Sequence, residues 1–117
     1  AQQRANEIRD NIVAKRGWWF RTEATVGVGY MEDGTKVISL NKGAYAKWGA
    51  DVLSQLRDGE ELLTPLEDVG HAEMRILRYA DDTGSVLKGI GASNAFCGEI
   101  CRPAILSRWG SAVMGQS

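Results

Sequence analysis

Four residues of this 117-residue chain have types and spacings that could bind a metal ion and act on a substrate. His71 is the only histidine, Glu73 follows it two positions later, and Cys97 and Cys101 are the only two cysteines. One imidazole and two thiolates form a three-ligand zinc set whose fourth tetrahedral position stays open to water. A carboxylate beside such a site can carry protons without binding the metal. The pattern predicts a catalytic Zn²⁺ site with His71, Cys97 and Cys101 as ligands and Glu73 as the catalytic proton carrier.

The four residues form two pairs in the sequence, His71 with Glu73 and Cys97 with Cys101. Each pair has a simpler interpretation when it is considered alone. A single histidine before a helix is commonly a cap or a surface residue, and cysteines are often buried apolar filler. Here both pairs fall at the starts of two successive predicted helices with one strand between them. This joint placement favours a shared metal site over two unrelated structural roles.

Hydrophobic periodicity and turn signals indicate the elements that would position these residues. Asp33-Gly34 is a strong hairpin signal, and Val26, Val28 and Tyr30 alternate with two glycines in the strand before it. A strand–helix–strand crossover after this hairpin predicts one α/β domain with a mixed sheet packed by helices. In chain order we predict a helix over residues 1–16, strands over 23–31 and 35–40, helices over 44–56 and 71–80, a strand over 85–93 and a helix over 98–109.

Composition narrows the classes of partner. The net charge of −1 argues against a broad basic surface for a phosphate backbone, although it allows a local contact. No apolar run is long enough for a membrane span, so no membrane association is expected. Two cysteines are too few to form a disulfide framework. As reduced thiols they are available to bind a metal ion.

The segments "HAE" and "CGEIC" resemble the H-x-E…P-C-x-x-C signature of the zinc-dependent cytidine deaminase superfamily. The resemblance covers most of the chain, because the first helix, the hairpin, the "HAE" helix, the next strand and the cysteine helix come in the order of that family. The chain is most similar to the deaminase domains of bacterial polymorphic toxins. It differs in having C-x-x-x-C, in Phe96 where proline is usual, and in a shorter C-terminal part.

The resemblance implies a three-layer cytidine-deaminase-like fold with a reduced C-terminal part. Residues 1–117 would form a single deaminase-like toxin domain that is the C-terminal part of a longer secreted protein. It further implies zinc-dependent hydrolysis of cytosine to uracil in nucleic acid, with DNA favoured over RNA as substrate. Such a domain would act as a monomeric interbacterial toxin in the cytoplasm of a target cell. A cognate immunity protein would be its second partner.

Two groups of substrate contacts are expected. Asn41 is placed like the family asparagine that contacts the sugar, and the backbone of Ala72 together with Ser93 could recognise the base edge.

The second group lies in "KRGWWFR", where Trp18, Trp19 or Phe20 could stack on a neighbouring base and Arg21, with Arg16, could contact phosphate. In the alternative interpretation, one or both tryptophans cover the sheet.

Three functional alternatives stay open at this stage. A deaminase of free nucleosides or nucleotides would suit the near-neutral charge, adenine could replace cytosine, and a zinc-stabilised binding module would need no catalysis. The unligated carboxylate of Glu73 argues against the last. The acidic segment "RDGEELLTPLED" is most simply a solvated face, and in a toxin could equally contact an immunity protein.

Overall fold

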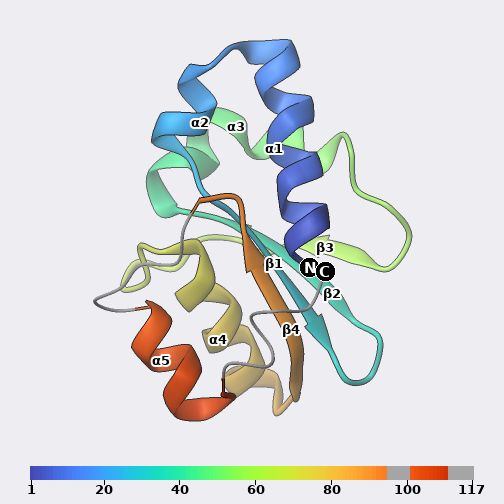
Figure 1. Cartoon of the computed structure of the whole chain (residues 1–117), viewed down its shortest axis with the longest axis vertical. Coiled ribbons are helices and arrows are strands. Elements are labelled where there is room, and N and C mark those ends of the chain that lie inside the picture. Colours follow the sequence, from blue (N-terminus) through green and yellow to red (C-terminus); the bar gives the residue numbers. More distant parts are fainter. Residues whose placement is uncertain (95–100, 111–117) are drawn as a thin grey trace.

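A computed structural model of the chain describes residues 1–94 and 101–110, which form helices and strands on both sides of a central sheet (Figure 1). The order is α1 (Gln2–Arg16), α2 (Trp19–Glu23), β1 (Val26–Met31), β2 (Lys36–Leu40), α3 (Lys42–Leu53), β3 (Glu60–Leu62), α4 (Ala72–Thr83), β4 (Leu87–Ala92) and α5 (Cys101–Arg108). The predicted α/β class is therefore confirmed.

The sheet has four strands in the order β3-β2-β1-β4. β1 is antiparallel to both of its neighbours, β2 and β4, whereas β2 and β3 are parallel. Because β2 and β4 both oppose β1, they run in the same direction and end at the same edge of the sheet. α4 connects β3 to β4, the two outer strands of the sheet, and begins at that same edge, as the predicted crossover requires.

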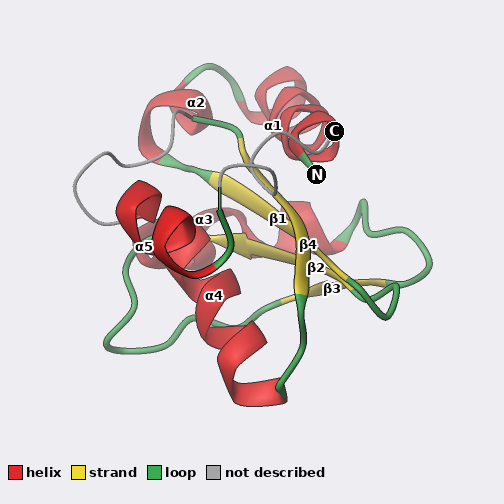
Figure 2. Cartoon of the chain, turned by 60° about the horizontal axis from the view of Figure 1, so that its bottom comes forward, coloured by secondary structure: helices red, strands yellow, loops and turns green. Residues whose placement is uncertain are grey.

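Helices cover both faces of the sheet, an arrangement compatible with a three-layer fold (Figure 2). One apolar core joins α1, α2 and α3 to the sheet and includes Val26 and Val28 of β1. A second core joins α4 and α5 to the opposite face and includes Ile76 and Ile90. The predicted alternation of valine and glycine along β1 thus directs the valines toward the first core and the glycines toward the second.

Two glycines of β1 let α4 approach the sheet closely. A Cβ added at Gly29 would lie 2.5 Å from Cγ2 of Ile76, and one added at Gly27 would lie 3.0 Å from Cδ1 of the same side chain. A Cβ at Gly27 would also lie 3.0 Å from Oγ of Ser39 and 3.3 Å from Cβ of Ala72. The small residues therefore set the depth at which the first turns of α4 lie on the sheet.

Glycines end two of the helices, and the hairpin turn predicted at Asp33-Gly34 is confirmed. Gly17 follows α1 with φ of 99°, and Gly84 ends α4 with φ of 68°, in the left-handed region. In the hairpin, Gly34 has φ of 94° and the Asp33 side chain accepts a 2.9 Å hydrogen bond from the amide of Thr35.

The sequence-based assignment missed two short elements, α2 and β3. The strand predicted over 23–31 begins only at Val26, because residues up to Glu23 belong to α2. β3 lies inside the segment interpreted as an acidic connection, where it pairs in parallel with β2 through Leu62 and its two preceding residues. α4 also continues to Thr83, beyond the predicted end. Residues 98–100 of the last predicted helix lie outside the described residues, and up to Gly110 no described strand follows β4.

The interpretation of "RDGEELLTPLED" as a solvated face is wrong for its central residues. The Glu60 carboxylate forms a bidentate pair with Arg4, at 2.7 Å to Nε and 2.8 Å to Nη2, and both side chains are at least 95% buried. Leu62 and Leu63 are buried as well. The local charge pattern concealed this role because Arg4 lies far away in the sequence.

Across the described helices, none combines the length and the apolar character that crossing a membrane would require.

Candidate functional site

The predicted "HAE" motif forms the start of α4. His71 is the N-cap residue with extended backbone angles, φ of −91° and ψ of 138°, and its side chain makes no capping hydrogen bond. His71 is exposed, whereas Glu73 in the first turn is only 3% exposed. The imidazole is thus accessible, and the buried carboxylate lies at the helix end whose dipole stabilises negative charge.

The Glu73 side chain is unusual because it is only 3% exposed and yet has no described counter-charge beside it. It makes no hydrogen bond or ion pair with any residue among those that the structure describes. Buried carboxylates normally have partners, since burying an uncompensated charge is costly. A group left in this way at a helix start is available to exchange a proton with a bound molecule.

Ser39 fixes the first turn of α4 from below. Its buried hydroxyl donates a 2.6 Å hydrogen bond to the backbone carbonyl of Ala72, the residue between His71 and Glu73. The amide of Lys42 donates a 3.0 Å bond to the carbonyl of Gly70, just before the motif. The motif is therefore attached to β2 and to the start of α3 on both of its sides.

Asn41 connects the end of β2 to the start of β1. Its Oδ1 accepts a 2.8 Å hydrogen bond from the amide of Thr25, and its Nδ2 donates a 3.2 Å bond to the carbonyl of Glu23. Asn41 thus lies at the same edge of the sheet as His71. Its amide is already used to position the chain where α2 passes into β1.

Ser93 and Asn94 complete this edge after β4. The Ser93 hydroxyl accepts a 2.8 Å hydrogen bond from the buried amide of Val26, which leaves its own proton for another acceptor. Nδ2 of Asn94 donates 3.0 Å bonds to the carbonyl of Ala24 and to Oγ1 of Thr25. We call this cluster of Thr25, Asn41, His71, Ser93 and Asn94, where β1 and α4 begin and β2 and β4 end, the polar edge.

The aromatic segment lies on α2, directly before the polar edge. Trp18 and Trp19 are 63% and 74% exposed, and the guanidinium of Arg21 lies 5.8 Å from the ring centre of Trp18. The alternative that these tryptophans cover the sheet is therefore wrong. Phe20, in contrast, is fully buried and packs edge-on against Trp48 at 5.1 Å between ring centres, so its ring is inaccessible to a base.

The predicted cysteine ligands are only partly covered by the structure. Cys97 lies outside the described residues, and α5 begins at Cys101. α5 packs beside α4 through the second core, so both predicted ligand helices lie on one face of the sheet (Figure 1). Within the described residues, no three His, Cys, Asp or Glu side chains gather as a metal site.

The donor chemistry of the described part fits zinc at one position. The His71 imidazole is exposed and makes no hydrogen bond with a described group, so either ring nitrogen could bind a metal. Beside it, Glu73 could move protons, and the polar edge supplies hydrogen-bonding groups for a polar ring.

Sequence reasoning did not predict Ser39 and Asn94 as members of this region. A serine in a strand and an asparagine after one carry no distinctive local signal, and both act on residues more than 30 positions away. Comparison of the chain with protein-family models, curated proteins and solved structures found no match.

Proposed function

We propose that this chain is a zinc-dependent deaminase that converts cytosine to uracil in nucleic acid, with DNA as the preferred substrate. The observation that carries the proposal is the pairing at the start of α4 of an accessible imidazole, His71, with a buried carboxylate, Glu73, that has no described partner. A purely structural zinc site has no use for such a carboxylate.

The order and placement of the helices and strands also support the resemblance to the cytidine deaminase superfamily. The hairpin of β1 and β2, the helix that begins with the "HAE" motif, the strand β4 and the helix that begins at Cys101 follow each other as the resemblance implies. They build a mixed sheet with helices on both faces, which is compatible with the three-layer cytidine-deaminase-like fold.

His71, Cys97 and Cys101 would hold the zinc ion. When bound, zinc supplies a water molecule whose lowered pKa makes it a nucleophile at neutral pH. Glu73 then removes a proton from the attacking water as the new C–O bond forms at C4 of cytosine. The same carboxyl group delivers that proton to the ring nitrogen N3. A second proton passes from the new C4 hydroxyl through Glu73 to the amino group. The C–N bond then breaks as the C4 carbonyl forms, ammonia leaves and uracil remains.

The remaining residues of the polar edge would orient the substrate. The Ser93 hydroxyl has a proton to donate, and Ala72, within the motif next to this edge, contributes its backbone amide. Asn41 would act near the sugar, although its amide already bridges Thr25 and Glu23. Trp18, Trp19 and Arg21 favour a nucleic acid over a free nucleoside, because a single nucleoside would leave this exposed surface without a ligand.

The experiment that tests the activity supplies purified, zinc-loaded protein with single-stranded DNA, duplex DNA, RNA and free cytidine, and measures uracil. We expect uracil from DNA and none with Glu73→Ala. Uracil from free cytidine alone would favour the nucleoside deaminase, hypoxanthine from adenine would change the base, and no product from any substrate would overturn the proposal.

The biological setting that we propose is that of an interbacterial toxin domain, which acts as a monomer in the cytoplasm of a target cell and is neutralised by an immunity protein. This part rests on the resemblance to toxin deaminase domains. Induced expression in a bacterium should arrest growth and raise genomic uracil, and Glu73→Ala should do neither. Arrest by both proteins would contradict a toxic deamination.

A further inference from the structure

We infer that α2 and the charged side chains around it form a platform for single-stranded DNA, an inference that rests on the proposed function and specifies its substrate. Trp19 and Trp18 are the two most exposed large hydrophobic residues in the described part of the chain. Two adjacent indole rings exposed to water do not contribute the stabilisation that burial of their apolar surface would provide. Their exposure is explained if they stack on flat ligands such as bases.

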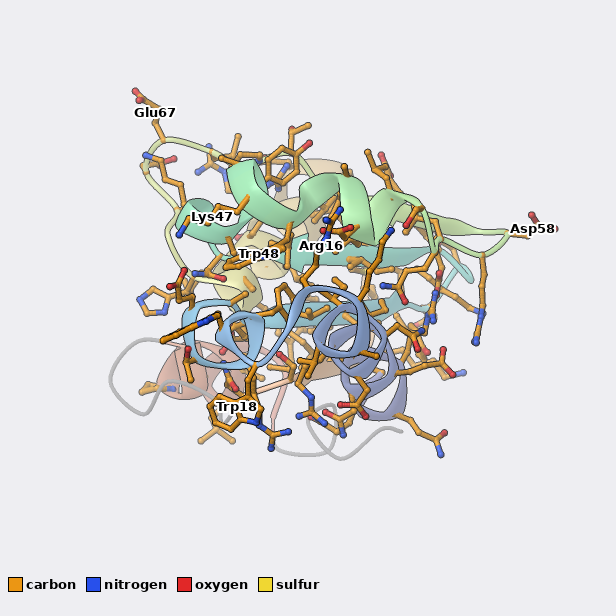
Figure 3. All side chains as sticks on the ribbon, turned by 90° about the horizontal axis from the view of Figure 1, so that it is seen from above. Arg16, Trp18, Lys47, Trp48, Asp58 and Glu67 are labelled. Atoms are coloured by element: carbon orange, nitrogen blue, oxygen red, sulfur yellow. The ribbon has the colours of Figure 1, made fainter. Side chains whose placement is uncertain are left out.

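Positive charge lies on α2 and on the helices beside it. Arg21 stacks over Trp18, Lys15 and Arg16 lie at the end of α1, and Lys47 lies in the middle of α3, with the last three side chains 61%, 52% and 60% exposed. In Figure 3, Trp18 and Lys47 project on opposite sides of α2, and Arg16 lies beside it.

Two acids, Asp51 and Glu23, each pair with cations of this group. With four cations and two acids, these side chains around α2 together carry a net charge of +2, although the whole chain has a net charge of −1. This local excess complements a phosphate backbone.

The platform is structurally continuous with the candidate catalytic region. α2 ends at Glu23, whose carbonyl is bound by Asn41, and the next carbonyl along, that of Ala24, is bound by Asn94. Asn41 is in turn followed by Lys42, whose amide binds the carbonyl of Gly70 next to His71. A single DNA strand bound on α2 is therefore adjacent to the residues that would receive the target base.

The nature of the surface favours a single strand over a duplex. Stacking on an indole requires an unpaired base, because the faces of paired bases are covered by their neighbours in the helix. A duplex instead needs a long basic stripe or an element that enters a groove. α2 has only five residues and offers neither.

The polar side chains of α2 favour DNA over RNA. Recognition of RNA commonly uses the ribose 2′-hydroxyl as a hydrogen-bonding group. The Thr22 hydroxyl donates to the carbonyl of Trp19 at 3.0 Å, and the Glu23 carboxylate pairs with Lys47 at 2.8 Å. Thr22 therefore has no hydroxyl proton left to donate to a 2′-hydroxyl, and the Glu23 carboxylate already has a cationic partner within the protein.

The test is a binding measurement that does not depend on catalysis. Fluorescence anisotropy with a labelled oligothymidylate of about 12 nucleotides, the size of one typical binding site, reports affinity without any cytosine to deaminate. We expect wild-type protein to bind it more tightly than a duplex of equal length or oligouridylate. Trp19→Ala and Trp18→Ala should each raise Kd about 5-fold or more, while Trp19→Phe should restore much of the affinity.

Matched controls separate stacking and local charge from general effects. Val86→Ala removes another exposed apolar side chain at the far end of the sheet, and Lys88→Ala removes an exposed charge from β4. Neither should change Kd by more than about 2-fold, whereas Arg21→Ala should weaken binding and lower its salt dependence.

Unchanged affinity in the tryptophan variants, or equal or tighter binding of duplex or oligouridylate, would overturn the inference even if the protein deaminates cytosine. Conversely, loss of oligothymidylate binding in these variants would support the platform even if no uracil is ever formed.

Discussion

The hydroxyl of Ser39 and the carbonyl of Ala72 are joined by a buried 2.6 Å hydrogen bond that attaches the start of α4 to the end of β2. Ala72 separates His71, which faces solvent, from Glu73, which is buried. The bond therefore holds the two residues with different chemical roles in one fixed orientation. Proton transfer depends strongly on such positioning.

Replacing Ser39 by alanine should destabilise the fold modestly and impair the site more than the fold. Loss of one buried hydrogen bond costs about 1 kcal/mol, or a decrease of roughly 3–6 °C in Tm. Turnover should fall further, because the first turn of α4 would lose its attachment. Thermal melts and uracil assays measure the two effects. Ser54→Ala, which removes a similar bond to the carbonyl of Asp51 at the solvent-exposed end of α3, is the control. Equal effects of both variants on turnover would contradict the positioning role.

Gly29→Ala should displace α4. The new Cβ would lie 2.5 Å from Cγ2 of Ile76, and that methyl group is attached too close to the helix backbone to move away freely. We expect a loss of about 2 kcal/mol in the free energy of unfolding, measured by urea denaturation.

Two further variants test this steric explanation. Gly43→Ala, where a Cβ has open space in α3, should be neutral or slightly stabilising. Ile76→Leu, which lacks the Cγ2 methyl group, should recover part of the loss when combined with Gly29→Ala. Additive effects in the double variant would argue against the contact as the cause.

The pair of Arg4 and Glu60 should make stability depend on pH in the acid range. Burial raises the pKa of Glu60, but the hydrogen bond from Arg4 and the amide of Arg57 lower the pKa more, so it lies below its ordinary value of 4.5. A lowered folded-state pKa contributes stability above that ordinary value and loses it as the pH falls through the lowered pKa.

Glu60→Gln should therefore lower stability at neutral pH by about 2–4 kcal/mol and flatten the decline below pH 4.5. Denaturation curves from neutral to acid pH measure both effects. Glu67→Gln, an exposed carboxylate whose side chain forms no ion pair with a described residue, should reproduce the wild-type profile. An equally steep acid decline in Glu60→Gln would assign the pH dependence to other groups.

Zinc binding should depend on the three predicted ligands and not on Glu73. Purified protein should contain about one zinc ion per chain, as a three-ligand catalytic site requires. His71→Ala, Cys97→Ser and Cys101→Ser should each reduce this content strongly when it is measured by elemental analysis. Undiminished zinc in any of these three variants would remove that residue from the site.

The long elements could be predicted from sequence because their periodicity reflects burial against a neighbouring layer. In α1, Ala5, Ile8 and Ile12 recur at helical spacing and are buried, and the glycines of β1 alternate with buried valines. α2 could not be predicted in this way, because five residues with two exposed tryptophans provide no period. β3 depends on pairing with β2, more than 20 residues away.

In the candidate site, too, local sequence predicts some features, whereas others depend on tertiary packing. The start of α4 at "HAE" could be predicted from the motif, but the contrast between exposed His71 and buried Glu73 depends on how the helix lies on the glycines of β1. The positions of Ser39 and Asn94 follow from strand order, which the local sequence does not encode. Phe20 and Trp19 are adjacent aromatics of similar hydrophobicity, and only the packing of α2 buries one and exposes the other.

The most direct measurement of the central claim follows a single-stranded DNA with one cytosine by mass spectrometry, comparing wild-type protein with Glu73→Gln. Glutamine keeps the size of the side chain but cannot carry the proton. We predict complete conversion of the cytosine to uracil by the wild type, and at least a roughly 100-fold slower conversion by Glu73→Gln at unchanged zinc content. Equal rates for the two proteins, or no conversion by zinc-loaded wild type, would contradict the assignment of Glu73 as the catalytic residue of a cytosine deaminase.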